Sequence, residues 1–137
     1  MKKAMIVVLV FIIVTLSITG CSAVGDHTEI GEALIYDYYN LYNANNADQA
    51  CNLFIDELLN MVGGRAGLTE VLNTRYQYYG VVENIDINRI GFEYANDESL
   101  IDYEVEAIYS IGGTFTETFT VYVTNDQGIF SAFNLPE

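Results

Sequence analysis

Apolar and polar residues follow a helical period in the first half of the chain beyond residue 28. From Glu29 to Asn43, apolar side chains recur every three or four positions, which places them on one face of a helix. A second helix is predicted from about Ala47 to Met61, with Asn46 as its N-cap. A third is predicted to start at Thr69 and to end at Gly80. The apolar face of the first helix carries Ile30, Leu34, Tyr38, Leu41 and Tyr42.

After Gly80 the period changes to two, which is typical of strands with one buried face. Short turns at Gly112-Gly113 and at residues 125–128 join consecutive strands, so the sheet is predicted to be an antiparallel meander. Its alternation of apolar and polar residues indicates that one face is covered. The predicted fold class is α+β, with three N-terminal helices packed on a curved antiparallel sheet of about four strands. The predicted strands are residues 85–90, 101–110, 114–124 and 129–135.

The N-terminal segment has the pattern of an export signal. Lys2 and Lys3 precede fifteen uncharged residues that end at Ile18. A membrane-spanning helix needs about 20 apolar residues, whereas the core of a signal peptide needs only about 7–15. The length favours a signal peptide. The alternative is an uncleaved anchor helix, which would also hold the rest of the chain outside the cytoplasm.

The residues Ile18-Thr19-Gly20-Cys21 resemble the lipobox of bacterial lipoproteins. This resemblance implies cleavage before Cys21 and acylation of its thiol with a diacylglycerol, palmitate being the expected acyl chain. We therefore expect a lipoprotein signal peptide over residues 1–20, a lipidated tether over 21–28, and one α+β domain over 29–137. The expected location is the cell membrane, where the protein is lipid-anchored and faces outside the cytoplasm.

The chain is strongly acidic. Its 5 basic and 19 acidic residues give a formal net charge of −14, which becomes −16 once Lys2 and Lys3 leave with the signal peptide. Such a surface repels phosphate backbones and anionic lipid head groups, so we expect neither nucleic acid binding nor a polybasic membrane patch. The charge serves solubility or attracts a cationic partner.

The second cysteine is expected to be structural. With lipid on Cys21, Cys51 has no other cysteine to pair with. A buried thiol packs as a small apolar side chain, whereas a reactive one needs a nearby base. The single histidine, His27, lies in the predicted tether. The helical face that Cys51 shares also carries Phe54, Ile55, Leu58 and Val62.

The order of these elements resembles the nuclear transport factor 2-like superfamily, whose domain is a cystatin-like cone. The resemblance rests on the segment Asn46-Ala47-Asp48-Gln49-Ala50 after the first helix, a third helix ending in Tyr79-Gly80, and a final aromatic strand. It is greatest to small bacterial lipoproteins of that class, whose function is unknown. Those usually carry a Trp after a Gly-Lys turn in the last strand, where this chain has Gly128-Ile129-Phe130.

The resemblance also implies where catalysis would occur. Enzymes of this superfamily use an Asp or an Asp–His pair inside the cone, with a Tyr as donor. The predicted domain contains no histidine, so no catalytic residue is predicted. No metal site or cofactor is predicted either, because the acidic turns at 97–98 and 125–126 lack the spacing of a calcium loop. The aspartates that fall mostly on polar sides of their elements are Asp37, Asp56, Asp86 and Asp102.

All 11 tyrosines lie in the predicted domain. They either fill an ordinary core or, because helices do not fully close the wide end of a cone, form the rim of a concave apolar site. Three placements are open for Arg89: inside the cone, paired with Glu117, or exposed at the end of its strand. The predicted lining of this site is Tyr38, Tyr42, Tyr76, Tyr79, Arg89, Tyr103, Val105, Phe119 and Val121.

The function expected from these features is that of a membrane-tethered extracytoplasmic binding or interaction module. We expect it to be non-enzymatic, with an unknown small molecule or an envelope protein as partner, and the membrane bound through the lipid on Cys21. One alternative is an isomerase or dehydratase that acts on a small molecule in a cone pocket. Another is a structural envelope subunit that forms a homodimer through the open face of the sheet.

Overall fold

A computed structural model describes the backbone of residues 19–136 and the side chains from Gly25 onward. Residues 1–18 of the predicted signal peptide and the side chain of Cys21 lie outside the described part. Four antiparallel strands form one sheet in the order β1-β2-β3-β4. The elements are α2 (Thr19–Asn43), α3 (Ala47–Ala50), η1 (Cys51–Leu53), α4 (Asp56–Met61), α5 (Gly64–Tyr79), β1 (Val82–Ala95), β2 (Glu98–Tyr109), β3 (Gly113–Thr124) and β4 (Gln127–Asn134).

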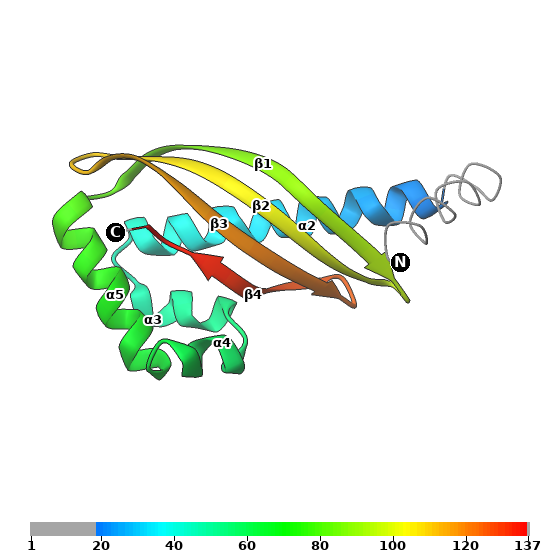
Figure 1. The fold of residues 1–137 in the computed structure, drawn as a ribbon, viewed down its shortest axis with the longest axis horizontal. Coiled ribbons are helices and arrows are strands. Elements are labelled where there is room, and N and C mark those ends of the chain that lie inside the picture. The colour runs from blue at the N-terminus through cyan, green and yellow to red at the C-terminus, as the bar shows by residue number, and fades with distance from the viewer. Residues whose placement is uncertain (1–18, 137) are drawn as a thin grey trace.

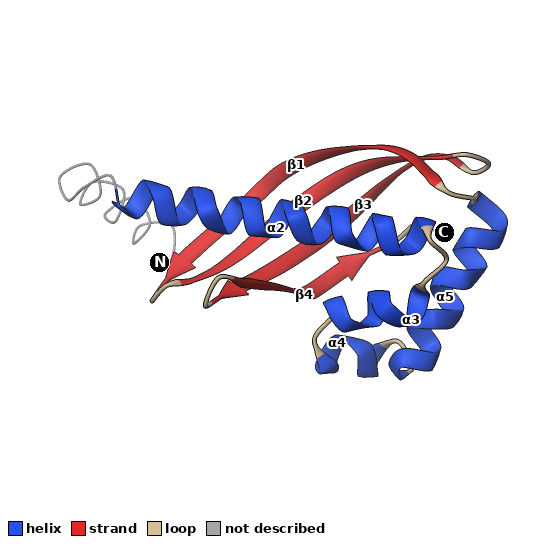
Figure 2. Ribbon diagram, turned by 180° about the vertical axis from the view of Figure 1, so that it is seen from behind, coloured by secondary structure: helices blue, strands red, loops and turns tan. Residues whose placement is uncertain are grey.

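The arrangement is the predicted α+β one. The long helix α2 runs along one face of the curved sheet, as both ribbon views show (Figure 1, Figure 2). The shorter helices α3, α4 and α5 gather beside β4 (Figure 1). No described helix combines the length and the apolar character that crossing a membrane requires.

Helix α2 begins earlier than the pattern of residues predicts. Residues 22–28, expected as a polar tether, form part of this helix. His27 is buried, its Nδ1 shares a hydrogen bond of 2.6 Å with Ser99 Oγ, and its ring lies 5.8 Å from that of Tyr94. Contacts with β1 and β2 therefore extend the helix beyond what its weak local propensity indicates. The expectation that the domain lacks a histidine was wrong.

The second predicted helix is interrupted. Asn46 caps it as expected, accepting a hydrogen bond of 3.4 Å from the N–H of Gln49. At Phe54 the backbone becomes extended (φ −113°, ψ 142°), and the residue forms a parallel bridge with Phe130 of β4. Pairing with the sheet edge thus replaces the helix at this point, and it inserts the Phe54 ring into the core. Cys51 is buried as predicted, and its thiol donates to the carbonyl oxygen of Ala47 at 3.3 Å.

Two of the sheet turns follow directly from their residues. Asn96-Asp97 and Asn125-Asp126 all have positive φ, between 50° and 61°. Two successive residues of this kind make the turn that matches the twist of a β-hairpin, and Asn and Asp tolerate it better than most residues. The interpretation of Asp97 and Asp126 as turn formers is confirmed, whereas Glu98, expected in the first of these turns, begins β2.

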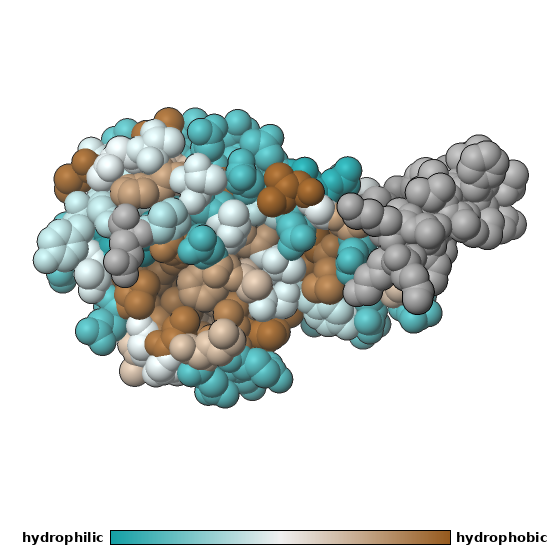
Figure 3. All heavy atoms as spheres, viewed as in Figure 1, coloured by the Kyte–Doolittle hydropathy of each residue, from teal (hydrophilic) through white to brown (hydrophobic). Residues whose placement is uncertain are grey.

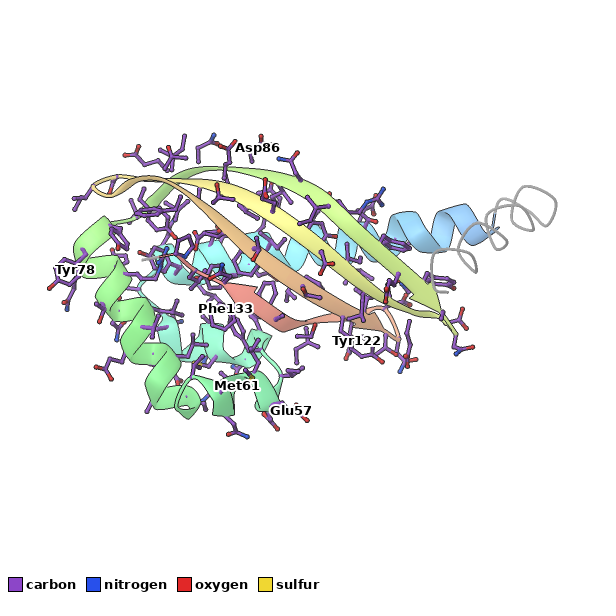
Figure 4. The ribbon with its side chains drawn as sticks, in the orientation of Figure 1. Glu57, Met61, Tyr78, Asp86, Tyr122 and Phe133 are labelled. Carbon is purple, nitrogen blue, oxygen red and sulfur yellow. The ribbon has the colours of Figure 1, made fainter. Side chains whose placement is uncertain are left out.

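The two faces of the sheet differ in chemistry. The face toward α2 carries the core, which includes Ile35, Tyr103, Val121 and Phe130. Acidic and threonine side chains alternate with these on β2 and β3 and point to the open face. The space-filling view shows the region over β1 as mostly hydrophilic, whereas apolar residues gather between β4 and the short helices (Figure 3). Phe133 and Met61 lie in that apolar region (Figure 4).

Candidate functional site

A buried charge pair lies inside the cone. Glu117 projects inward from β3 and is 0% exposed, and Arg75 projects from α5 and is 6% exposed. Arg75 Nη2 lies 3.2 Å from Glu117 Oε2. The other carboxylate oxygen, Oε1, accepts hydrogen bonds from the hydroxyls of Tyr109 at 2.5 Å and Tyr39 at 3.1 Å. Four elements, α2, α5, β2 and β3, therefore meet at one carboxylate.

The guanidinium of Arg75 has further partners. Its Nη1 donates to the carbonyl oxygen of Pro136 at 2.5 Å, which fixes the C-terminal segment against α5. Its Cζ lies 5.2 Å from the ring centre of Tyr79 and 5.8 Å from that of Phe115. Cation–π contacts of this kind stabilise a desolvated arginine.

The surroundings shift the titration of the pair. Burial raises the pKa of the Glu117 carboxyl, although the hydrogen bond from Tyr109 and the charge of Arg75 oppose that shift. Burial lowers the pKa of Arg75, but its hydrogen bond with Tyr109 and the charge of Glu117 outweigh this, so the net shift is upward. Burial, with the charge of Glu117, also raises the pKa of Tyr39 and Tyr109, so both remain hydroxyl donors.

Tyr38 lies in the same interior but makes no such bond. Its ring packs 5.3 Å from the centre of Phe119 and 6.0 Å from that of Phe130. Its buried hydroxyl has no hydrogen-bond partner in the described part of the chain, nor has Arg75 Nε. Burial, followed by the charge of Glu117, raises the pKa of Tyr38 well above its usual range.

The residues predicted to line a pocket lie in different environments in the structure. Tyr38, Tyr42, Tyr103 and Phe119 are core residues. Tyr76 and Tyr79 are half-buried, and Tyr76 lies 5.7 Å from Tyr42 between ring centres. The hydroxyl of Tyr103 donates to the carbonyl oxygen of Thr28 at 3.0 Å, far along α2 from the charge pair. Their role in binding stays a prediction.

Arg89 does not join the interior. It is exposed on β1, where Nη1 donates to Thr28 Oγ1 at 3.2 Å and the guanidinium lies 5.6 Å from the Phe92 ring. The arginine that pairs with Glu117 is Arg75. The sequence carried a signal for this pair, because Arg75 falls on the apolar face of its helix with Leu68 and Leu72. Glu117 likewise falls on the inward face of β3.

A surface hollow lies between α2 and β1. Its volume is about 310 Å³. Tyr36 is 51% exposed there, and Asn43 closes one side by accepting from the Val82 N–H at 2.8 Å and donating to its carbonyl oxygen at 2.8 Å. The lining residues are Tyr36, Tyr39, Asn40, Asn43, Val82, Glu83, Asn84 and Ile85. Sequence reasoning missed this site because two distant segments form it.

One residue, Tyr39, connects the two sites. It lines the hollow, yet its hydroxyl donates to Glu117 in the interior. The hollow therefore has a wall that the buried charge pair holds in place. Within the described residues, no group of three His, Cys, Asp or Glu side chains is arranged to hold a metal ion.

Solved structures with the same fold include the protein named "Putative Scytalone Dehydratase" from Novosphingobium aromaticivorans. Its TM-score is 0.56 at 14% identity, over 82% of this chain and 85% of that one. The protein named Rd1NTF2_05, in a substituted variant, gives 0.52 at 13% identity, over 78% and 96%. RPA3114, a SEC-C motif containing protein from Rhodopseudomonas palustris, gives 0.50 at 12% identity, over 77% and 78%.

These likenesses show the fold alone. No protein-family model matches the chain, and no curated protein does. The domain has the α+β cone fold of nuclear transport factor 2-like proteins. That part of the sequence-based prediction is confirmed.

Proposed function

We propose that the protein is a non-enzymatic binding module, tethered outside the cytoplasm by lipid on Cys21, and that the hollow between α2 and β1 is its binding site. The observation that carries the proposal is the half-exposed Tyr36 beside the amide of Asn40 and the carboxylate of Glu83. Half of the lining is aromatic or aliphatic and half is polar, so the hollow offers both apolar contact and hydrogen-bonding groups to a ligand. The volume of about 310 Å³ falls at the small end of such sites.

The interior carboxylate supports the non-enzymatic part of the proposal. A general base must come within hydrogen-bond distance of a substrate proton. Glu117 is fully buried, and both its oxygens already have partners in Arg75, Tyr109 or Tyr39. Its arrangement is that of a structural charge pair, in which both carboxylate oxygens have partners that offset part of the cost of burying the charge.

The alternative is an isomerase or dehydratase of the cone-fold type. A fold neighbour carries a dehydratase name, and Glu117 with Tyr109 would be the acid–base pair of such an enzyme. A substrate would then have to displace Tyr39 or enter past Arg75. This alternative predicts a ligand that contacts Glu117, whereas the binding proposal predicts one that contacts Tyr36.

Ligand-induced thermal shifts of the full chain in detergent test these two sites. The probes are a panel of amino acids, polyamines and neutral monosaccharides. We expect any stabilising probe to lose about tenfold in affinity in Tyr36→Ala and to be unaffected in Tyr78→Ala, a more exposed tyrosine on α5 (Figure 4). A probe that responds to Glu117→Gln but not to Tyr36→Ala supports the enzyme alternative. A panel without any shift contradicts the small-ligand form of the proposal.

The tether is tested separately. Cys21→Ser removes the thiol that would carry the lipid, so the protein should leave the membrane fraction or accumulate as an unprocessed precursor. Fractionation followed by immunoblotting checks this, with Cys51→Ser as the matched control. Unchanged membrane partition of Cys21→Ser contradicts the lipoprotein assignment.

The homodimer through the open sheet face stays a proposal. In its favour, none of the described helices lies over that face in Figure 1. Against it, β1 and β2 place Asp86, Asp102 and Glu106 on the open face, where a second copy would bring the same charges. Sedimentation at low and high salt distinguishes the two cases, since screening should favour the dimer.

A further inference from the structure

The two edges of the sheet differ in how far their backbone hydrogen-bonding groups are already paired. At β4, the bridge between Phe54 and Phe130 and the bond from Ile55 N–H to the Phe130 carbonyl oxygen (3.0 Å) occupy part of the edge. In the described part of the chain, no strand pairs with the outer side of β1. An edge strand turns the N–H and C=O of every second residue away from its sheet, where a further strand can pair with them.

One outward-facing position of β1 is already paired. The Asn43 side chain from α2 donates to the Val82 carbonyl oxygen and accepts from the Val82 N–H, both at 2.8 Å. The amide thus makes the two bonds that the backbone of an added strand would make. Beyond Val82, α2 supplies no second amide of this kind to β1 among the described contacts.

The next stretch of β1 is regular. Its pairing with β2 is irregular between Val82 and Asn84 and again between Arg89 and Gly91, but the register is unbroken from Asn84 to Arg89. These six residues extend over about 20 Å, which is enough for a short added strand. Bulges protect an edge against pairing, and here they flank the stretch instead of interrupting it.

The hollow opens at the start of this stretch. Asn84 and Ile85 line it from β1, and Tyr36 and Asn40 line it from α2. A groove between a helix and an edge strand is the geometry in which some domains bind extended peptides, with backbone bonds giving affinity and a pocket selecting a side chain. The hollow has the size for a side chain of such a peptide.

The charges select the occupant. Glu83 and Asp86 are exposed at the start and middle of the edge, where Asp86 points away from the sheet (Figure 4), and the exposed Arg89 lies only at the far end of the stretch. Without its signal peptide the chain carries a formal charge of −16. A second copy would bring the same charge and be repelled, whereas a segment rich in Lys or Arg would be attracted and guided to the edge.

We infer that β1 binds an extended, positively charged peptide segment of a partner protein, which adds as an outer strand along Asn84–Arg89 and places a side chain in the hollow beside Tyr36. This inference rests on the proposed binding function and specifies its ligand.

Fluorescence anisotropy with the full chain in detergent tests the strand. The probe is a fluorescein-labelled decapeptide of alternating Lys and Thr. Two further versions carry N-methyl groups on every second amide. One version has them on the odd-numbered amides and the other has them on the even-numbered amides, and these two patterns are the two phases. In an added strand only one phase faces β1, so one version should bind at least about tenfold more weakly and the other within about twofold of the parent. Equal loss in both versions, or no binding up to about 1 mM, contradicts strand addition.

Protein variants test the place. Asp86→Lys should weaken the parent peptide several-fold, whereas Glu70→Lys, the same charge change at an exposed position of α5, should leave it within about twofold. Equal effects of the two variants would mean that only net charge attracts the peptide, which overturns the site.

A further comparison distinguishes failure of this inference from failure of the proposed binding function. One outcome is that Tyr36→Ala weakens binding while the two N-methylated peptides bind equally well. In that case the hollow binds the peptide without strand addition, so the inference fails and the binding function stands. If neither this peptide nor the small-molecule panel binds, both fail. Sedimentation that shows self-association sensitive to Asp86→Lys identifies a second copy as the occupant, which also overturns the inference.

Discussion

The interior charge pair and the surface hollow share Tyr39 but differ in every property that matters for binding. Glu117 and Arg75 are buried, and each bonds to the other and to Tyr109. Tyr36 in the hollow is half-exposed, and the hollow opens to solvent. A buried ionic network holds elements in register, whereas an open polar site can exchange water for a ligand. Under the proposed function, the titratable interior serves the fold, and the edge of the sheet is the binding surface.

The largest expected effect comes from breaking the interior pair. Arg75→Met should lower the free energy of unfolding by about 3–5 kcal/mol, because Glu117 would be left without its countercharge. Urea denaturation of the full chain in detergent measures this. The double variant Arg75→Met with Glu117→Met should recover most of the loss, since it removes both charges. A single variant as stable as the parent contradicts the structural role of the pair.

The second effect is a pH dependence specific to Glu117. A carboxyl whose pKa is raised in the folded state binds its proton more tightly there than in the unfolded chain. Its stabilising contribution is therefore present below its ordinary pKa of 4.5 and is lost as the pH rises through the higher folded pKa. The slope is at most about 1.4 kcal/mol per pH unit.

Glu117→Gln isolates that slope from the remaining acids. Between pH 4 and 8, the stability of the parent should fall relative to this variant, as measured by urea denaturation at each pH. Parallel curves for the two proteins would show that Glu117 titrates normally when folded.

A smaller effect is expected at the residue that the two sites share. Tyr39→Phe removes the hydroxyl that donates to Glu117 but keeps the ring that lines the hollow. We expect a loss of about 1 kcal/mol in unfolding free energy and no change in the affinity of the peptide probe. Loss of binding with unchanged stability would mean that the Tyr39 hydroxyl serves the hollow and does not stabilise the interior.

The smallest effect should have the opposite sign. The Tyr38 hydroxyl is buried without a partner among the described residues, so Tyr38→Phe removes an unsatisfied polar group. The variant should be equal to the parent or more stable by up to about 1 kcal/mol. Tyr42→Phe is the control, because that hydroxyl donates to the Gly80 carbonyl oxygen at 3.0 Å and its removal should destabilise. A destabilised Tyr38→Phe would indicate that the hydroxyl is satisfied in solution.

Much of the fold was predictable because local patterns and tertiary contacts agree. The period of two beyond Gly80 gave the strands, and Gly112-Gly113 and residues 125–128 gave two of their turns. The errors fall where a tertiary contact outweighs local preference. His27 docks on Ser99 and makes a helix of an expected tether, and Phe54 bridges Phe130 and interrupts an expected helix.

The candidate sites were predictable only in part. Residue spacing placed the tyrosines on inward faces, and most of those predicted to line a pocket do point inward. Residue spacing could not show whether the interior is filled or open. The filling of the interior depends on how α5 and the C-terminal segment close over the sheet. Arg75 was overlooked although it falls on an apolar helix face, since a charged residue there can equally extend its head group to water.

The sequence by itself determined the α+β class, the strand order of a meander and the acidic character of the chain. Periodicity and turn chemistry are local, so they can be read along a chain. Only the tertiary structure decided that Arg75 and not Arg89 meets Glu117, and that Tyr36 and Asn84 border one hollow. Arg75 and Glu117 are 42 positions apart in the sequence, and Tyr36 and Asn84 are 48 positions apart. Their distance in space depends on how α2 and α5 pack on the sheet, which residue spacing does not encode.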